Sequence, residues 1–143
     1  MKRAYSILRK DKIYIQSYSQ TTTGLWIATG PVYIADAAHP DELGEHIRDV
    51  LNGSMVGVPH PAQDEWRAVQ APMLNAAGVK SWKTLAKGAK SIGIEYDGAL
   101  VLMEPSANYE NQGGTSLPEK AIECEFDSPE LGHALLRAFA ACT

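Results

Sequence analysis

The sequence predicts an α+β fold, a single domain over residues 1–143 with a mostly antiparallel sheet of about six to seven strands and three to five helices. Three observations predict it. The length suits one core. Several short segments alternate apolar and polar residues and are joined by brief turns, as antiparallel strands are. Separate segments place apolar residues on one helical face and end at glycine or proline.

The stretch 78–105 is expected to organise the fold, because it contains two apolar strands joined by Asp97 and Gly98. That dipeptide favours a two-residue type I′ turn, in which both residues have positive φ. The pairs expected on the core side are Tyr96 with Ala99, Ile94 with Val101, and Ile92 with Met103. The opposite side carries Gly93, Glu95, Leu100, Leu102 and Glu104. Because the second strand is apolar on both faces, it should lie inside the sheet.

The N-terminal third predicts an antiparallel meander. Residues 4–9 and 12–18 form two alternating strands with a turn at Lys10-Asp11. Two shorter strands follow, residues 25–28 and 32–34, separated by Gly30-Pro31. Proline cannot donate a hydrogen bond to a neighbouring strand, so Pro31 should stand at a strand start or a sheet edge.

The middle of the chain predicts helices. One begins at Pro40 and ends at Gly53, and residues 54–61 should be extended because they contain two prolines. The run 63–77 contains Pro72, so we expect two helical pieces there, ended by Gly78. Ser81 should cap a short helix over residues 82–87.

The C-terminal part predicts a long loop, a strand and a helix. Residues 105–118 form the loop, and residues 121–126 alternate as a half-buried strand. The last helix starts after Ser128-Pro129. It repeats the Glu-Leu-Gly of the first helix, so we expect Gly44 and Gly132 to allow each helix to approach the sheet closely.

Composition and charge indicate a soluble protein. Hydrophobic residues are 45% and charged residues 21% of the chain, and no apolar run reaches membrane-spanning length. No signal-peptide core forms at the N-terminus, which predicts a cytoplasmic location and reduced thiols at Cys124 and Cys142. The net charge is −4, but the signs are segregated: residues 36–65 contain seven acids against Arg48 alone, and residues 91–130 contain nine acids against Lys120. Such blocks suit either a solvated surface or a charged partner.

Catalytic and metal-binding patterns are absent from the sequence. His39, His46, His60 and His133 have no zinc-ligand spacing, and Glu42 and His46 lie four apart without a second histidine. Glu123 and Glu125 share the solvent side of one strand, which is more typical of solvation than of catalysis. We therefore expect no enzyme activity, no metal and no cofactor.

A basic block could contact nucleic acid. Residues 66–90 contain five bases and no acid, together with two tryptophans. The block includes Trp66, Lys80, Trp82, Lys83, Lys87 and Lys90, and its fifth base is Arg67. Because the protein is acidic overall and no aromatic motif lies on a sheet, the sequence favours no direct nucleic-acid binding.

Several segments together resemble the immunity proteins of contact-dependent growth inhibition (CDI) systems. They are LWIATGPVYI, ELGEHIRDVLNGS, VPHP, LNAAGVKSWKTLAKGAKSIGIE, LPEKAIECE and ELGHALLRAFAAC, spanning about residues 25–142. The resemblance implies a cytoplasmic inhibitor that binds the C-terminal toxin domain delivered by a neighbouring bacterium and blocks its active site or substrate groove. Many such toxins are nucleases, often acting on RNA. The resemblance carries over no specific binding residue.

An acidic inhibitor would be attracted to the basic groove of a nuclease, which holds phosphates. The hypothesis is that acidic residues supply the charge and two aromatic residues act as anchors. The charged candidates are Asp36, Asp41, Glu42, Asp64, Glu65, Glu104 and Glu110, and the anchors are Trp66 and Tyr109.

Two alternatives stay open. One is a small hydrolase or RNA-processing enzyme that uses His39, His46 or His60 with a nearby carboxylate. The other is an interaction adaptor without a toxin partner. Replacing each histidine by alanine distinguishes the enzyme, and co-expression with a toxin distinguishes the adaptor.

Overall fold

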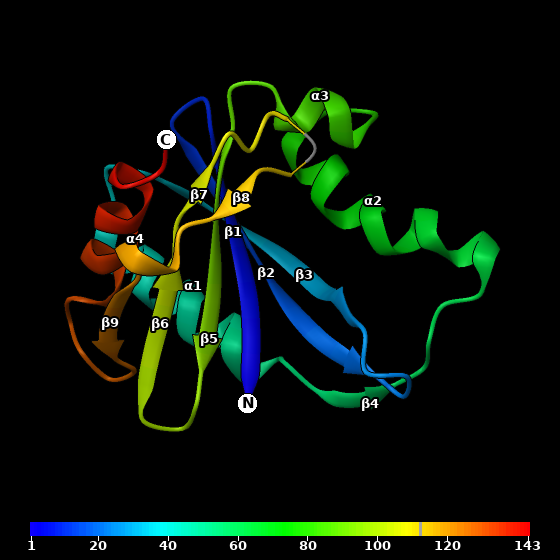
Figure 1. Ribbon diagram of the computed structural model, residues 1–143, viewed down its shortest axis with the longest axis horizontal. Coiled ribbons are helices and arrows are strands. Elements are labelled where there is room, and N and C mark those ends of the chain that lie inside the picture. The colour runs from blue at the N-terminus through cyan, green and yellow to red at the C-terminus, as the bar shows by residue number, and fades with distance from the viewer. Residues whose placement is uncertain (112) are drawn as a thin grey trace.

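The computed structural model describes residues 1–111 and 113–143 and confirms the α+β fold (Figure 1). Within the described residues, the main sheet has seven strands in the order β3-β2-β1-β5-β6-β9, with β4 paired in parallel to β2. The main strands are β1 (Lys2–Arg9), β2 (Lys12–Thr21), β3 (Trp26–Asp36), β4 (Val56–Val58), β5 (Lys90–Tyr96), β6 (Leu100–Glu104) and β9 (Ile122–Glu125). The α-helices are α1 (Pro40–Asn52), α2 (Trp66–Ala77), α3 (Trp82–Ala86) and α4 (Leu131–Ala140), and 3-10 turns lie at η1 (Gln63–Glu65) and η2 (Pro118–Lys120).

The predicted meander is present, with one correction at its third strand. Residues 25–28 and 32–34 were expected to be separate strands, but β3 is continuous through Gly30-Pro31. Gly30, Pro31 and Val32 form a bulge opposite Gln16, where the register of β2 and β3 shifts. Gln16 stabilises the bulge by donating from Nε2 to the Gly30 carbonyl at 2.9 Å. Pro31 lies on the edge strand, as predicted, so its missing N–H costs no sheet hydrogen bond.

One face of the sheet packs against α1 and α4. Ile13 and Ile15 of β2, together with Ile92 and Ile94 of β5, meet the apolar sides of both helices. The glycine prediction is corrected here, because Gly44 and Gly132 face each other rather than the sheet. The two helices therefore approach each other closely while both cover the same sheet face.

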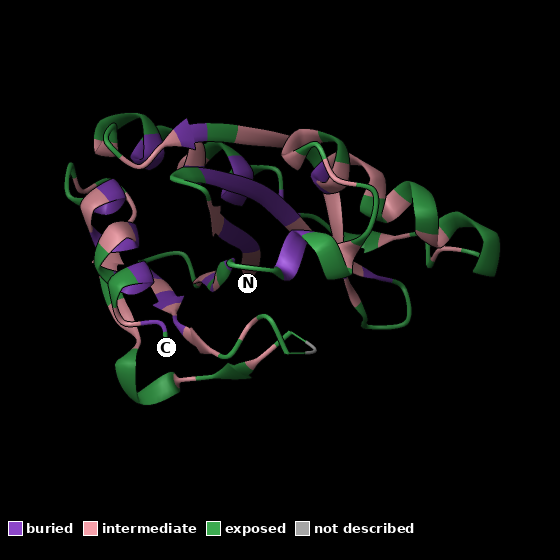
Figure 2. Cartoon of the chain, turned by 90° about the horizontal axis from the view of Figure 1, so that it is seen from above, coloured by how far each residue is buried: buried purple, intermediate pink, exposed green. Residues whose placement is uncertain are grey.

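The other sheet face is covered by α2 and α3, but only over part of its width. Tyr5, Tyr14, Met73 and Leu85 form the centre of this second core. Figure 2 shows that most of α2 is exposed or intermediate. The expected break at Pro72 is wrong, because α2 continues through it. The fully buried Met73 holds the following turn against the sheet, so packing outweighs the lost backbone hydrogen bond.

Several helix ends agree with the sequence. α1 begins at Pro40, and α2 is ended by Gly78, which has φ +70°. Ser81 caps α3, since its Oγ accepts a hydrogen bond from the Thr84 N–H at 3.2 Å. Within the described residues, no helix combines the length and the apolar composition needed to cross a membrane.

The β5–β6 hairpin has a different turn from the one predicted. Tyr96 pairs with Val101 and Ile94 with Met103, a shift of two residues from the expected register. The Asp97 carboxylate accepts hydrogen bonds from the N–H groups of Ala99 at 2.8 Å and Leu100 at 2.9 Å, which stabilises a longer loop. Because side chains alternate with a period of two, the predicted faces survive the shift. β6 lies between β5 and β9, as expected.

The loop predicted over residues 105–118 is partly ordered into a second, small sheet. β7 (Ser106–Ala107) pairs with β8 (Thr115–Ser116), and η2 follows. The C-terminus fixes this segment, because the Asn108 N–H donates to the Thr143 carbonyl at 2.8 Å. Gln112, at the tip of the predicted loop, lies outside the described residues.

Candidate functional site

The second sheet face is left without a helix over β5, β6 and β9. On this side the register places Glu95 beside Leu102 and Leu102 beside Glu123, while Leu100 pairs with Glu125. We call this surface the open acidic face. Its members are Gly93, Glu95, Leu100, Leu102, Glu104, Glu123 and Glu125. Two leucines thus lie among four carboxylates.

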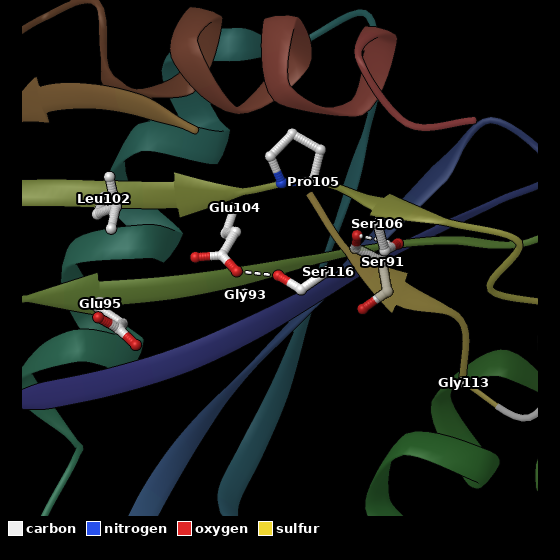
Figure 3. Close-up of a pocket in the computed structure, with 9 residues that line it drawn as sticks. All are labelled: Ser91, Gly93, Glu95, Leu102, Glu104, Pro105, Ser106, Gly113 and Ser116. Atoms are coloured by element: carbon white, nitrogen blue, oxygen red, sulfur yellow. Dashed lines mark hydrogen bonds between the residues drawn. The ribbon is translucent and has the colours of Figure 1, made fainter. Parts of the chain in front are cut away.

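The open acidic face is concave. One cavity of about 210 Å³ lies between β5, β6 and the β7–β8 segment, and Figure 3 shows Glu95, Leu102 and Glu104 around it. A second cavity of about 190 Å³ is lined by Met1, Leu100 and Glu123 among others. Glu95 and Leu102 line both cavities, so the two form one continuous depression along the strands.

The charges on this face are mostly uncompensated. Arg3 of β1 lies 3.4 Å from Glu95, and both side chains are more than one-third exposed, so water screens this ion pair. Glu104 accepts a hydrogen bond from the Ser116 hydroxyl, as Figure 3 shows. Glu123 and Glu125 are exposed and have no ion pair among the described residues. The face therefore presents negative charge to a partner.

The segment between β6 and η2 forms one border of the face. The Ser106 hydroxyl donates to the Ser91 carbonyl at 2.7 Å, which attaches β7 to β5. On the far side, the Trp82 indole donates to the Tyr109 hydroxyl at 3.2 Å, and burial raises the pKa of that tyrosine. Glu110 accepts a hydrogen bond from the Gly88 N–H. The structure thus places the predicted residue Glu104 on the open acidic face, and Tyr109 and Glu110 on the segment beside it.

Asp36, Asp41 and Glu42 lie elsewhere. Asp36 ends β3, the strand at the other edge of the main sheet, and the helix that carries Asp41 and Glu42 covers the opposite sheet face. Asp36 accepts a hydrogen bond from the Ala38 N–H at 2.9 Å and lies 3.6 Å from Lys12. These contacts, the backbone hydrogen bond first, hold the pKa of Asp36 below its usual value.

Asp64, Glu65 and Trp66 form a third group at the start of α2, at the far right of Figure 1. Glu65 has a local role, because its carboxylate accepts a hydrogen bond from the Ala62 N–H at 2.8 Å. Trp66 meets His60 edge-on, with ring centroids 5.9 Å apart. The nine predicted site residues therefore occupy three separate places.

Three acids of the open acidic face were not among the predicted site residues, namely Glu95, Glu123 and Glu125. Alternation along the hairpin predicted that Glu95 and Glu104 share one side of the sheet. Glu123 and Glu125 were interpreted only as solvent-exposed surface residues. The missing information was the pairing of β6 with β9, which brings the two acidic rows together. A sequence cannot supply that pairing, because the strands are separated by the 105–118 segment.

The histidines that an enzyme would use have separate surroundings. His46 stacks on Tyr33 and lies 3.4 Å from Glu42, whereas His60 Nδ1 lies 2.8 Å from the Thr23 hydroxyl. Five cavities on the surface of the described residues have no histidine in their linings. Among residues 1–111 and 113–143, no three His, Cys, Asp or Glu side chains gather in a group able to hold a metal ion.

Comparison with known proteins gives a consistent result. The family model for the CDI immunity protein, CdiI, matches residues 2–142. A Neisseria meningitidis protein of unknown function, NMB0488, superposes with a TM-score of 0.80 at 19% identity, covering 99% of this chain and 95% of that one. A chain from a CdiA-CT/CdiI toxin and immunity complex of Yersinia pseudotuberculosis gives 0.79 at 19% identity, covering 99% and 97%. No curated protein matches the sequence.

Proposed function

Because this chain belongs to the CDI immunity protein family, we propose that it binds the toxin domain of a cognate CdiA protein and neutralises it by covering the active site. The match over residues 2–142 includes the first two strands, which lay outside the segments that suggested the resemblance. A similar fold in a complex of CdiA-CT toxin and immunity protein supports a toxin partner. The expected site of action is the cytoplasm.

The observation that carries the proposed contact surface is the concave, helix-free sheet face with four carboxylates. Leu100 and Leu102 supply apolar area at its centre, and the glutamates surround them. Apolar centres with a charged rim are typical of protein interfaces. A stable complex requires about 1,200–2,000 Å² of buried surface. To reach this size, the proposed contact also includes the neighbouring segment with Tyr109 and Glu110.

The charge of this face suits a nuclease as the toxin. A nuclease groove is lined with basic residues because it holds phosphates, and an acidic surface attracts such a groove during diffusion. Occupying the groove excludes the nucleic acid without any chemical step by the inhibitor. The Asp36, Asp41 and Glu42 group, together with Asp64, Glu65 and Trp66, lies away from this face and supplies secondary contacts if the toxin is large enough to reach it.

Charge-reversal variants test whether the toxin binds the open acidic face. The double substitution Glu123→Lys/Glu125→Lys removes two exposed carboxylates of the face, and Glu45→Lys/Asp49→Lys makes the same charge change on the exposed side of α1. We expect the first variant to associate with the cognate toxin at least about tenfold more slowly at low salt, with a weaker salt dependence. The α1 variant should keep the wild-type rate. Equal rates for the two variants would rule out the open acidic face as the contact surface.

Two further measurements test separately where the toxin binds and whether the inhibitor covers the toxin's active site. Asp41→Lys/Glu42→Lys tests the group at the start of α1, and a smaller effect than that of Glu123→Lys/Glu125→Lys is expected. Toxin activity is then measured with increasing inhibitor. If a saturating complex leaves the toxin active on a small substrate, the inhibitor does not cover the active site.

A further inference from the structure

A second groove, of opposite charge, lies on the outer side of α2 and α3. Its volume is about 510 Å³, within the range of about 300–1,000 Å³ that ligand sites occupy. The polar and aromatic residues that line it are Arg67, Gln70, Asn75, Lys80, Ser81 and Trp82. We call it the Trp82 groove. It combines two cations, two side-chain amides and one large aromatic ring.

Trp82 borders two further hollows. One of about 150 Å³ also contains the stacked rings of Tyr5 and Tyr18, whose centroids are 4.6 Å apart. The other, of about 650 Å³, adds Lys83 and Asn111. The Trp82 indole N–H donates to the Tyr109 hydroxyl at 3.2 Å, which fixes the plane of the indole ring. The ring is therefore a pre-oriented surface on which a flat group can stack.

Few acids lie near these cations in the sequence, and the nearest are Asp64 and Glu65, just before Arg67. Residues 66–90 contain five bases and no acid, and Arg67, Lys80 and Lys83 make no ion pair within the described residues. Glu110 lines the adjoining hollow, but its carboxylate is engaged by the Gly88 N–H. Gly113 lines both this hollow and the cavity of the open acidic face, so the intervening loop separates a positive surface from a negative one.

We propose that the Trp82 groove binds a short single-stranded nucleic acid segment, a site that goes beyond toxin neutralisation. Arg67, Lys80 and Lys83 contact the phosphates. Among flexible polymers, only single-stranded nucleic acids combine strongly anionic groups with flat rings, the bases. A base stacks on Trp82. Gln70 and Asn75 offer both donors and acceptors to base edges, which an acidic peptide would not need. A duplex keeps its bases stacked inside and cannot use the ring.

Titration with RNA tests the proposal. The probe is a fluorescently labelled single-stranded RNA of about 10 nucleotides, within the usual site size, and anisotropy is measured with the full chain. Three phosphate contacts give a salt slope of about −2, so affinity should fall about 20-fold between about 50 and 200 mM salt. Arg67→Glu/Lys80→Glu should weaken binding at least tenfold. Lys120→Glu/Arg137→Glu, which makes the same charge change away from the groove, should weaken it less than twofold.

Two outcomes would overturn the proposal: equal affinities of the groove variant and its control, or polyglutamate of matched length competing as well as RNA. Trp82→Leu provides an independent check on stacking, with a tenfold or greater loss expected. Because Trp82 also packs against the second core, its folding is verified first by thermal unfolding. If Trp82→Leu does not fold, the comparison of Arg67→Glu/Lys80→Glu with Lys120→Glu/Arg137→Glu decides whether the groove binds RNA. Arg67→Glu/Lys80→Glu alters neither the open acidic face nor Tyr109, so this variant should still neutralise the toxin, and the two proposals can fail separately.

Discussion

Gly132 of α4 lies directly against Pro40 of α1: a Cβ built on Gly132 would stand 1.7 Å from the Pro40 carbonyl oxygen. A Cβ on Gly44 would likewise stand 3.4 Å from the Gly132 backbone nitrogen. The two helices therefore meet backbone to backbone at their N-terminal turns. This contact lets α1 and α4 cover the same sheet face side by side.

Replacing Gly132 with alanine should destabilise the protein. Because the obstructing atom belongs to backbone, it cannot rotate away, and we expect a loss of roughly 3 kcal/mol, at the upper end for overpacking. The control is Gly93→Ala on the open acidic face, where a Cβ meets nothing within 4 Å. That variant should stay within about 0.5 kcal/mol of wild type. Urea unfolding measures both, and similar midpoints would contradict the close helix contact.

Arg48 should also contribute strongly to stability. Its Nε donates to the Phe126 carbonyl and its Nη2 to the Ser128 carbonyl, each at 2.9 Å, which ties α1 to the connection between β9 and α4. Arg48→Ala leaves both carbonyls without these charged donors, so we expect a loss of about 2–3 kcal/mol. The exposed Arg137 is the matched control. Equal thermal stability of Arg48→Ala and Arg137→Ala would show that the bridge contributes little.

The Asp97 turn predicts an acid-dependent stability. Hydrogen bonds from Leu100 and Ala99 lower the pKa of Asp97 below its ordinary value. The ionised Asp97 carboxylate therefore stabilises the fold fully at pH values above the ordinary carboxyl pKa. This stabilisation is lost as the pH falls through the pKa that Asp97 has in the folded state. Wild type should therefore be more stable than Asp97→Ala near neutral pH, and the difference should shrink in acid. Thermal unfolding across this range checks it, and a difference that is independent of pH would contradict the role of the charge.

Tyr18 predicts a stability change in alkali. Burial, followed by the neighbouring Tyr109, raises the pKa of Tyr18 from 10.0 to about 12. The unfolded chain then loses this proton first, so stability is complete below pH 10 and is lost as the pH rises toward about 12. One proton corresponds to about 1.4 kcal/mol per pH unit. Over this alkaline range, the unfolding free energy of Tyr18→Phe should fall with pH less steeply than that of wild type, by this amount. Equal slopes for the two proteins would contradict the burial of the Tyr18 hydroxyl.

The turns show where local sequence is informative. Asp97-Gly98 is the dipeptide favoured for a two-residue turn, yet only Gly98 has positive φ, at 100°, because the Asp97 side chain bonds to the following amides. The tight turn with two left-handed residues is found instead at Lys10 and Asp11, with φ of 52° and 63°. The location of both turns was predictable from residues that break apolar runs. Their type depended on side-chain hydrogen bonds and on the register of long strands.

The site shows a similar division. Alternation along the hairpin correctly placed Glu95, Leu102 and Glu104 on one side of the sheet. It did not show whether a helix would cover that side. In the fold, Tyr5 and Tyr14 of β1 and β2 pack with Met73 of α2 and Leu85 of α3, and the same side of β5–β6 stays open.

The sequence by itself determined the family and most of the helices and strands, because helix ends, strand alternation and the quoted segments are properties of neighbouring residues. It also determined that acidic charge is abundant, but not where that charge gathers. Only the tertiary structure decided that β9 adds Glu123 and Glu125 beside β6, and that the bases of 66–90 surround Trp82 on a separate surface. The physical reason is that charges far apart along the chain become one surface only through strand pairing and helix packing, which local patterns do not specify.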